Sequence, residues 1–201
     1  MRRRYTLGRR QISADATRQR IVSAARELLA SPNGAHAMTI EAVARAAAVT
    51  RATVYQQFDT KQRLLAAVLD ALALDGGLDR IPTALQRDDP YEALDEFIAI
   101  LVRFYTMDRD IHRHLSAMAE IDPKFREIVS ERQSRRRAVL ELLAKRIEPT
   151  LARAPRRLAE SSDALFAITS AAMFDQLAGT RTPAQIAAIV QRLARAAIAP
   201  A

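Results

Sequence analysis

The residues most informative about chemistry, by type and by spacing, lie in one short stretch of the 201-residue chain, from Thr39 to Lys61. Glutamine and arginine can bond base edges in a DNA major groove, and alanine or threonine can approach a thymine methyl group. Hydroxyl groups and a lysine at a helix start are common phosphate donors. The stretch therefore has the residue types that bind duplex DNA. The candidate residues are Thr39, Thr50, Arg51, Ala52, Thr53, Tyr55, Gln56, Gln57 and Lys61.

Two short helices must hold these side chains in place. Thr39 is predicted to cap a helix over residues 40–46, and Thr50 to cap another over residues 51–58. The buried side of the first helix is predicted to be Ile40, Val43, Ala44 and Ala47. Two short helices joined by a three- to four-residue turn form a helix-turn-helix, whose second helix enters the major groove.

The second of these helices has two different faces. Val54 and Phe58 are four residues apart, so they share one face and are predicted to point into the protein. The opposite face then carries the candidate base contacts. Two interpretations stay open there: Gln56 and Gln57 contact bases or only phosphate and water, and Arg51 reaches a base or the DNA backbone.

The positive charge of the chain is confined to its first third. Residues 1–65 contain 12 Lys and Arg against 4 Asp and Glu, whereas residues 66–201 contain 19 of each, so the first part holds the whole net charge of +8. This asymmetry indicates a polyanion-binding N-terminal part. Residues 1–14 form a basic arm that we expect to be flexible. Its arginines either enter a minor groove or act only through their charge.

Composition excludes several kinds of chemistry. The chain has no cysteine, which rules out disulfides, thiolate zinc sites and cysteine nucleophiles. It has no apolar run of the roughly 18 residues that a membrane span needs, and no apolar stretch follows the basic arm as in a secretory signal. We therefore expect a cytoplasmic protein without membrane contact. His112 and His114 diverge by about 200° around a helix, so we expect no metal site there. The chain has only three histidines and no glycine-rich phosphate loop, so we also expect no cofactor and no enzyme activity.

Four motifs follow one another between residues 18 and 66. They are Arg20-Ile-Val-Ser-Ala-Ala-Arg-Glu-Leu-Leu29, Thr39-Ile-Glu-Ala-Val-Ala, Ala48-Val-Thr50 and Thr53-Val-Tyr-Gln-Gln-Phe-Asp-Thr-Lys61. In this order they resemble the DNA-binding domain of the tetracycline-repressor (TetR) family. The resemblance implies a homodimeric transcriptional regulator in which Tyr55 and Lys61 contact phosphate. It also implies an effector site in the C-terminal domain and dimerisation through the last two helices.

Two positions depart from the family pattern. Ala48 stands where the family usually has a turn glycine, and Met38 replaces the first residue of a common threonine pair. If Ala48 adopts a positive φ, its side chain costs roughly 1 kcal/mol. Met38 removes one potential phosphate contact.

Apolar residues recur at spacings of three and four, which predicts an all-α protein of about nine helices. The expected helices cover residues 15–30, 40–46, 51–58, 61–74, 90–106, 109–119, 123–147, 162–178 and 183–198. Together with the resemblance, they predict a helix-turn-helix domain over residues 15–60. They also predict a helical effector-binding and dimerisation domain over residues 61–201.

Bulky apolar residues of the second domain are either plain core or the lining of a pocket between helices. The pocket is expected to hold a small apolar or aromatic effector. Its candidate residues are Phe97, Leu101, Phe104, Tyr105, His112, Met118, Phe166 and Met173. The run Arg135-Arg136-Arg137 is instead expected to be solvated or ion-paired surface.

The helices over residues 162–178 and 183–198 are apolar around much of their circumference. They are expected to pair with a second copy in a four-helix bundle, and a wholly intramolecular core is the alternative. The expected function is a repressor that binds a palindromic operator and is released by its effector. The alternative is a DNA-binding module without a small-molecule effector, controlled by a protein partner or by abundance.

Overall fold

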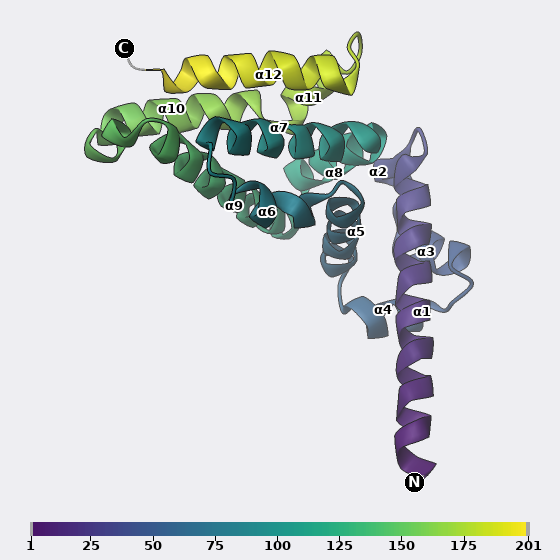
Figure 1. Cartoon of the computed structure of the whole chain (residues 1–201). Helices are drawn as coiled ribbons and strands as arrows, with labels where there is room; N and C mark the ends of the chain where they lie inside the picture. Colours follow the sequence, from purple (N-terminus) through teal and green to yellow (C-terminus); the bar gives the residue numbers. More distant parts are fainter. Residues whose placement is uncertain (1, 200–201) are drawn as a thin grey trace. The chain divides into compact units, whose positions relative to one another are not determined.

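The computed structural model describes residues 2–199, with side chains from residue 14 onward. Within this range the chain is helical and has no strand (Figure 1), so the all-α prediction is confirmed. The described α-helices are α1 (Arg2–Ala30), α2 (Gly34–Ala37), α3 (Ile40–Ala46), α4 (Arg51–Phe58), α5 (Lys61–Asp75), α6 (Ile81–Ala84), α7 (Pro90–Met107), α8 (Arg109–Ile121), α9 (Pro123–Ile147), α10 (Pro155–Ile168), α11 (Ala171–Leu177) and α12 (Pro183–Ile198). Two 3-10 helices, η1 (Leu78–Arg80) and η2 (Pro149–Arg153), lie between them.

The structure has three more α-helices in the described range than the nine expected. Two of the additional helices, α2 and α6, are four residues long. A helix this short has barely one turn, so its apolar residues show no recurrence at spacings of three and four. The spacing of apolar residues in the sequence therefore could not predict α2 and α6.

The first helix, α1, begins at Arg2 and not at residue 15 as expected. Residues 2–30 contain no proline, and most of them are good helix formers such as alanine, arginine, leucine and glutamine. Nothing in the local sequence therefore interrupts the helix. The side chains of the basic arm, at residues 1–13, lie outside the described part of the chain.

The single helix expected over residues 162–178 is two helices, α10 and α11. The Thr169 hydroxyl donates a hydrogen bond to the Leu165 carbonyl oxygen at 2.7 Å, and the Ser170 side chain accepts one from the Met173 amide at 3.3 Å. Hydroxyl side chains offer the backbone such alternative partners, so two in succession can end one helix and begin the next.

The chain divides into two compact units, Met1–Ala71 with Asp110–Arg126, and Leu72–Arg109 with Glu127–Ala201. We call them the N-terminal unit and the C-terminal unit. Most of α8 thus belongs to the N-terminal unit, where His114 Nδ1 lies 2.8 Å from the carbonyl oxygen of Leu29 in α1. The sequence-based division at residue 60 gave no sign of this, because α8 comes from a distant part of the chain.

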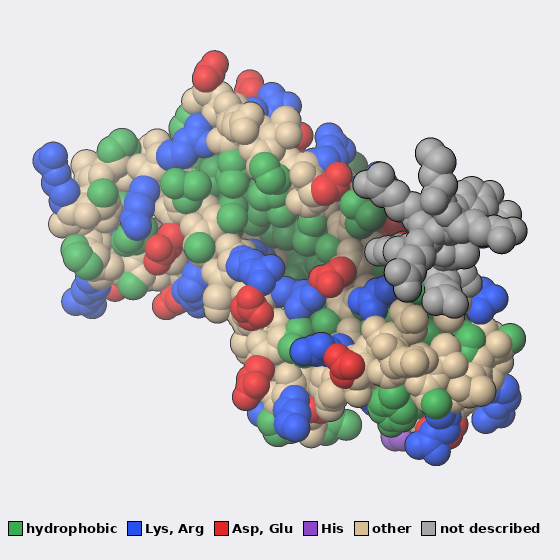
Figure 2. All heavy atoms as spheres, turned by 90° about the horizontal axis from the view of Figure 1, so that it is seen from below, with side chains coloured by type: hydrophobic (Ala, Val, Ile, Leu, Met, Phe, Trp, Pro, Cys, Tyr) green, Lys and Arg blue, Asp and Glu red, His purple; other side chains and the backbone are tan. Residues whose placement is uncertain are grey.

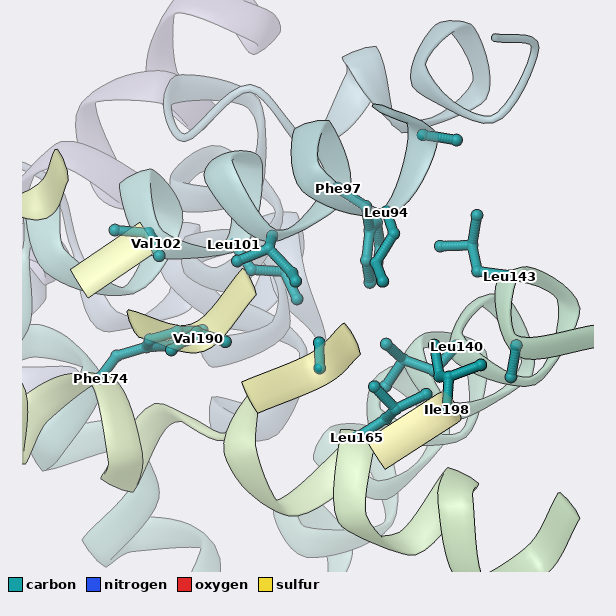
Figure 3. Packing of buried hydrophobic residues seen from close by; sticks show 14 of the residues in the cluster. Leu94, Phe97, Leu101, Val102, Leu140, Leu143, Leu165, Phe174, Val190 and Ile198 are labelled. Atoms are coloured by element: carbon teal, nitrogen blue, oxygen red, sulfur yellow. The ribbon is translucent and has the colours of Figure 1, made fainter. Parts of the chain in front are cut away.

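The core of the C-terminal unit is built from several of its helices. Figure 3 shows Leu94, Phe97 and Leu101 of α7 with Phe174 of α11 and Val190 of α12. All five side chains are at most 3% exposed. Helix α7 packs against α11 and α12, and α10 packs against α12.

The starts of the helices expected over residues 90–106, 123–147 and 183–198 are confirmed, and each begins at an Asp-Pro or Thr-Pro pair. The Asp89 carboxylate caps α7 and the Thr182 side chain caps α12. At the start of α9, Asp122 Oδ1 accepts hydrogen bonds from the amides of Lys124 at 3.1 Å and Phe125 at 3.2 Å. Its other oxygen accepts one from Gln62 Nε2 at 2.6 Å.

These contacts make the contribution of Asp122 to stability dependent on pH. Burial raises the pKa of Asp122, but the hydrogen bonds from Gln62, Phe125 and Lys124 and the charge of Lys61 outweigh it and hold the pKa below its ordinary value. A depressed carboxyl pKa stabilises the fold above the unfolded-state pKa of about 4, and this contribution disappears as the pH falls through the folded-state pKa.

Asp122→Asn should still cap α9, but its hydrogen bonds lose the strength that the carboxylate charge gives them. We expect the free energy of unfolding at pH 7 to fall by a few tenths to about 1 kcal/mol. The difference in free energy of unfolding between this variant and the wild type should shrink as the pH falls below about 4. Urea unfolding at pH 7, 5 and 3 measures it, with the exposed Asp88→Asn as the control. A difference that stays constant down to pH 3 contradicts the assigned role.

Candidate nucleic-acid interface

Helices α3 and α4 form the predicted helix-turn-helix in the N-terminal unit. The Thr39 hydroxyl oxygen accepts a hydrogen bond from the Ala42 amide, and the Thr50 hydroxyl oxygen accepts one from the Thr53 amide, each at 3.1 Å. Both caps are thus confirmed. The predicted inner faces are confirmed as well, since every one of their residues is at most 6% exposed: Ile40, Val43, Ala44, Ala47, Val54 and Phe58.

The turn between these helices depends on the backbone conformation of Ala48. Its φ is +52°, in the left-handed region that an alanine side chain disfavours. The amide of Val49 still bonds the Ala44 carbonyl oxygen at 2.9 Å, which closes the turn. The positive φ considered from the sequence is therefore present.

Replacing Ala48 by glycine is expected to stabilise the N-terminal unit by about 0.5–1 kcal/mol, because glycine adopts this φ without steric cost. The exposed Ala46→Gly, at the last residue of α3, is the control and should not stabilise, because Ala46 has no positive φ for glycine to relieve. Chemical denaturation of both variants measures the two effects. A destabilising Ala48→Gly would show that the turn does not strain alanine.

The outer face of α4 is open to solvent. Arg51, Ala52 and Gln56 are exposed and Tyr55 is 43% exposed, while Thr53 and Gln57 are half-buried. Solvent therefore reaches these α4 candidates, whereas Val54 and Phe58 are buried. Arg51, Tyr55 and Gln56 are the exposed large hydrogen-bonding side chains of the helix.

Arg18 of α1 holds the end of α4 in place, a role that sequence reasoning missed. Its guanidinium carbon lies 4.2 Å from the centre of the Phe58 ring, and its Nη1 donates a hydrogen bond to the Gln57 carbonyl oxygen at 2.7 Å. These residues are 39 positions apart. No local spacing signals such a contact.

Three of the candidates already have side-chain partners in the protein. Arg51 forms a 2.9 Å ion pair with Glu41 of α3, and the side chains are 59% and 50% exposed. The hydroxyls of Thr50 and Thr53 lie 2.9 Å apart. An ion pair this exposed contributes about 0–1 kcal/mol, so a phosphate or a base edge can compete for Arg51.

Lys61 is half-buried at the first residue of α5, next to the capping residue Thr60. Burial lowers its pKa, and the carboxylates of Asp122 and Glu41 act in the opposite direction. Its ammonium thus lies close to the free amides of a helix start, which attract anions together with it. Met38, by contrast, is fully buried and makes no surface contact.

The predicted effector residues are divided between the two units. Phe97 and Leu101 are in the core of the C-terminal unit, Phe104 is 8% exposed, and His112 and Met118 belong to the N-terminal unit. Among the others, Tyr105 and Phe166 pack against that core and Met173 is half-buried. The aromatic rings do meet: the Tyr105 ring centre lies 4.7 Å from that of Phe104 and 5.5 Å from that of Phe174.

A groove of about 480 Å³ lies elsewhere on the C-terminal unit, between α7 and α12. It is lined by Ala99, Val102, Arg103, Thr106, Met107, Pro183, Ala184 and Ala187. None of the predicted effector residues is among them. Small and aliphatic side chains dominate this lining, so sequence reasoning that started from bulky aromatic residues did not find it.

Charged side chains of both signs share the surface. Figure 2 shows one face of the molecule, on which Lys and Arg alternate with Asp and Glu. The interpretation of Arg136 as surface is wrong, since this residue is 8% exposed, whereas its neighbours Arg135 and Arg137 form ion pairs with Glu131 and Asp163. None of the helices in the described range is both long and apolar enough to cross a lipid bilayer.

The two capped helices, their turn and the open face of α4 define a helix-turn-helix protein. Residues 21–68 match the family described as bacterial regulatory proteins, tetR family. The N-terminal part of this chain is thus similar to bacterial regulatory proteins of the tetR family.

Relatives agree with this assignment. The chain is 37% identical over 59 residues to the HTH-type transcriptional regulator UidR of Escherichia coli K12, a match that spans 29% of this chain and 30% of UidR. A TetR-like regulator from Rhodococcus sp. RHA1 is 21% identical, with a TM-score of 0.67 over 90% of this chain and 94% of that one. NalD of Pseudomonas aeruginosa, described as the secondary repressor of the MexAB-OprM multidrug efflux pump, is 23% identical, with a TM-score of 0.67 over 92% and 96%. At these identities, the solved structures show the shared fold alone.

Proposed function

We propose that this chain is a dimeric, sequence-specific DNA-binding regulator of transcription that acts as a repressor. The observation that carries the proposal is the outer face of α4, which presents Arg51, Tyr55 and Gln56 to solvent on a helix-turn-helix of the tetR family. Such a helix places its exposed side chains against base edges in a major groove. The repressor role is proposed by analogy with NalD, which is a repressor.

The side chains divide by chemistry into two roles. Gln56, Gln57 and Arg51 have the donor and acceptor patterns that distinguish base pairs, and Ala52 is small enough to approach a thymine methyl. Phosphate contacts come from the hydroxyls of Tyr55, Thr39, Thr50 and Thr53 and from the ammonium of Lys61. An N-cap hydroxyl that accepts a backbone hydrogen bond still has its own hydrogen to donate to a phosphate.

The proposed dimer uses α10–α11 and α12, the helices of the expected interface. Helix α12 packs on α10 in the same chain and exposes Leu193 by 40%, with the small residues Ala188 and Ala196 on its open side. A two-fold pair would place two α4 helices about 34 Å apart, or at another groove-compatible spacing, which requires a palindromic operator. Sedimentation of the purified chain measures the dimer directly.

A small effector is proposed to shift the dimer between a DNA-binding and a released state. Coupling between two sites is typically 1–3 kcal/mol, which changes operator affinity by roughly 5–150-fold. By linkage, DNA must change the affinity for the effector by the same factor. The effector site is proposed in the C-terminal unit, because six of the eight predicted effector residues lie there.

Selection of random duplex DNA by the purified protein at about 50 and 200 mM salt tests the proposal. We expect an enriched palindrome and weaker binding at the higher salt. Salt-sensitive binding without an enriched sequence contradicts sequence-specific recognition.

Two variants separate the proposed roles on the selected duplex. Tyr55→Phe should cost about 1 kcal/mol on selected and random DNA alike, because it removes one phosphate hydrogen bond. Gln56→Ala should change the preferred base at one position by about 1–3 kcal/mol. Gln133→Ala, an exposed glutamine of α9, is the matched control. Equal losses on both DNAs for both variants contradict this division of roles.

A further inference from the structure

Arg136 is a buried cation within the C-terminal unit. It lies on α9, is 8% exposed, and faces the break between α10 and α11. Its Nη1 donates hydrogen bonds to the carbonyl oxygen of Thr169 and, at 3.2 Å, to the Thr169 hydroxyl. The break in the helix leaves this carbonyl oxygen free to accept a hydrogen bond from a side chain. Thr169 thus satisfies one edge of the guanidinium.

The other edge of the guanidinium includes a nitrogen that has no hydrogen-bond partner in the protein. Arg136 Nε is fully buried and has no hydrogen-bond partner. Among residues 14–199, no Asp or Glu forms an ion pair with Arg136, although Arg135 and Arg137 each have one. A buried guanidinium without a carboxylate is costly, and the edge formed by Nε and Nη2 is the one that fits a carboxylate in two parallel hydrogen bonds.

Two aromatic residues lie near this guanidinium, and a buried hydroxyl without a partner lies on the neighbouring helix α10. The guanidinium carbon of Arg136 lies 4.1 Å from the centre of the Phe166 ring. Tyr105 is close enough for the charge of Arg136 to oppose the rise that burial causes in the pKa of its phenol. On α10, Ser162 shares a face with Phe166 and Thr169, and its buried hydroxyl oxygen has no partner either.

We propose that Arg136 is the anchor of an effector site for an organic monocarboxylate with an apolar or aromatic tail. The carboxylate bonds Nε and Nη2, Ser162 supplies a further hydrogen bond, and the rings of Phe166 and Tyr105 contact the tail. The inference rests on the proposed function, since it names the ligand class of the effector.

The position of this site connects it to the proposed dimer. Thr169, which shares the guanidinium with the ligand, lies at the junction of α10 and α11. Helix α10 packs on α12, and both belong to the proposed dimer surface. A carboxylate on Arg136 therefore acts directly on the junction of the helices that set the spacing of the two copies.

Calorimetric titration of the full-length chain with 4-phenylbutyrate, in the absence of DNA, tests the site. The neutral 4-phenylbutanol has the same skeleton without the charge. We expect the acid to bind at least about tenfold more tightly than the alcohol, and Arg136→Gln to weaken acid binding at least about tenfold while leaving alcohol binding unchanged. The exposed Arg135→Gln should bind the acid as the wild type does.

Two further measurements keep the outcome clear if Arg136→Gln does not fold. Ser162→Ala removes only a hydroxyl and should weaken acid binding several-fold. At equal concentration, the acid should raise the melting temperature of the wild type more than the alcohol does. The proposal is overturned if the folded wild type does not bind the acid at millimolar concentration. It is also overturned if acid and alcohol bind equally, or if neither Arg136→Gln nor Ser162→Ala changes acid binding. Because no DNA is present, these results are independent of the selection experiment that tests DNA binding.

Discussion

Replacing Phe58 by alanine is expected to lower the free energy of unfolding of the N-terminal unit by about 3–5 kcal/mol, the usual cost of emptying a buried phenylalanine site. Phe58 is 3% exposed, shares the inner face of α4 with Val54, and lies under the guanidinium of Arg18. A helix of eight residues has almost no stability of its own. Loss of this anchor should therefore also abolish binding to every DNA sequence.

The matched control is Tyr55→Ala, on the opposite face of the same helix. Tyr55 is 43% exposed, so its removal should cost less than about 1 kcal/mol of stability while still weakening DNA binding. Urea unfolding and DNA titration of both variants separate the two effects. Equal stabilities for Phe58→Ala and Tyr55→Ala would contradict the assignment of the inner face of α4.

Replacing Gly34 by alanine is expected to destabilise the same unit by about 1–3 kcal/mol through overpacking. A Cβ at this position would lie 2.3 Å from the Leu29 carbonyl oxygen and 2.6 Å from His114 Nδ1. The first of these is a backbone atom, which cannot swing away as the end of a flexible side chain can. The end of α1 or the start of α2 must therefore shift, and the contact of His114 with Leu29 must lengthen.

Gly179→Ala serves as the control, because its Cβ would meet only the Gln176 carbonyl oxygen, at an ordinary 3.5 Å. This variant should change stability by less than about 0.5 kcal/mol. Chemical denaturation compares the two variants, and amide exchange in α1 and α8 locates the disturbance. A Gly34→Ala variant as stable as the wild type would show that the loop has room for a side chain.

Several features of the molecule were predictable because neighbours in the sequence specify them. A cap at Thr39 or Thr50 requires only the three residues that follow it, and the inner face of α4 follows from the spacing of Val54 and Phe58. The starts of α7, α9 and α12 carry proline at the first helical position. The open face of α4, which carries the proposed DNA contacts, follows from the same local rules.

Other features depend on residues that are far apart along the chain. Arg18 meets α4 across 39 positions, and His114 meets Leu29 across 85. Arg136 is one of three consecutive arginines, and nothing in its neighbours distinguishes it from Arg135 or Arg137. Its burial is decided by where α9 meets the break between α10 and α11.

The sequence by itself therefore determined the helical class, the helix-turn-helix and the face of α4 that is free to contact DNA, because hydrogen bonds within a helix and apolar spacing act over a few residues. Only the tertiary structure decided that α8 joins the N-terminal unit and that a guanidinium is buried without a carboxylate at the α10–α11 break. Burial depends on which distant helices come together, and that information is absent from any short stretch of the chain.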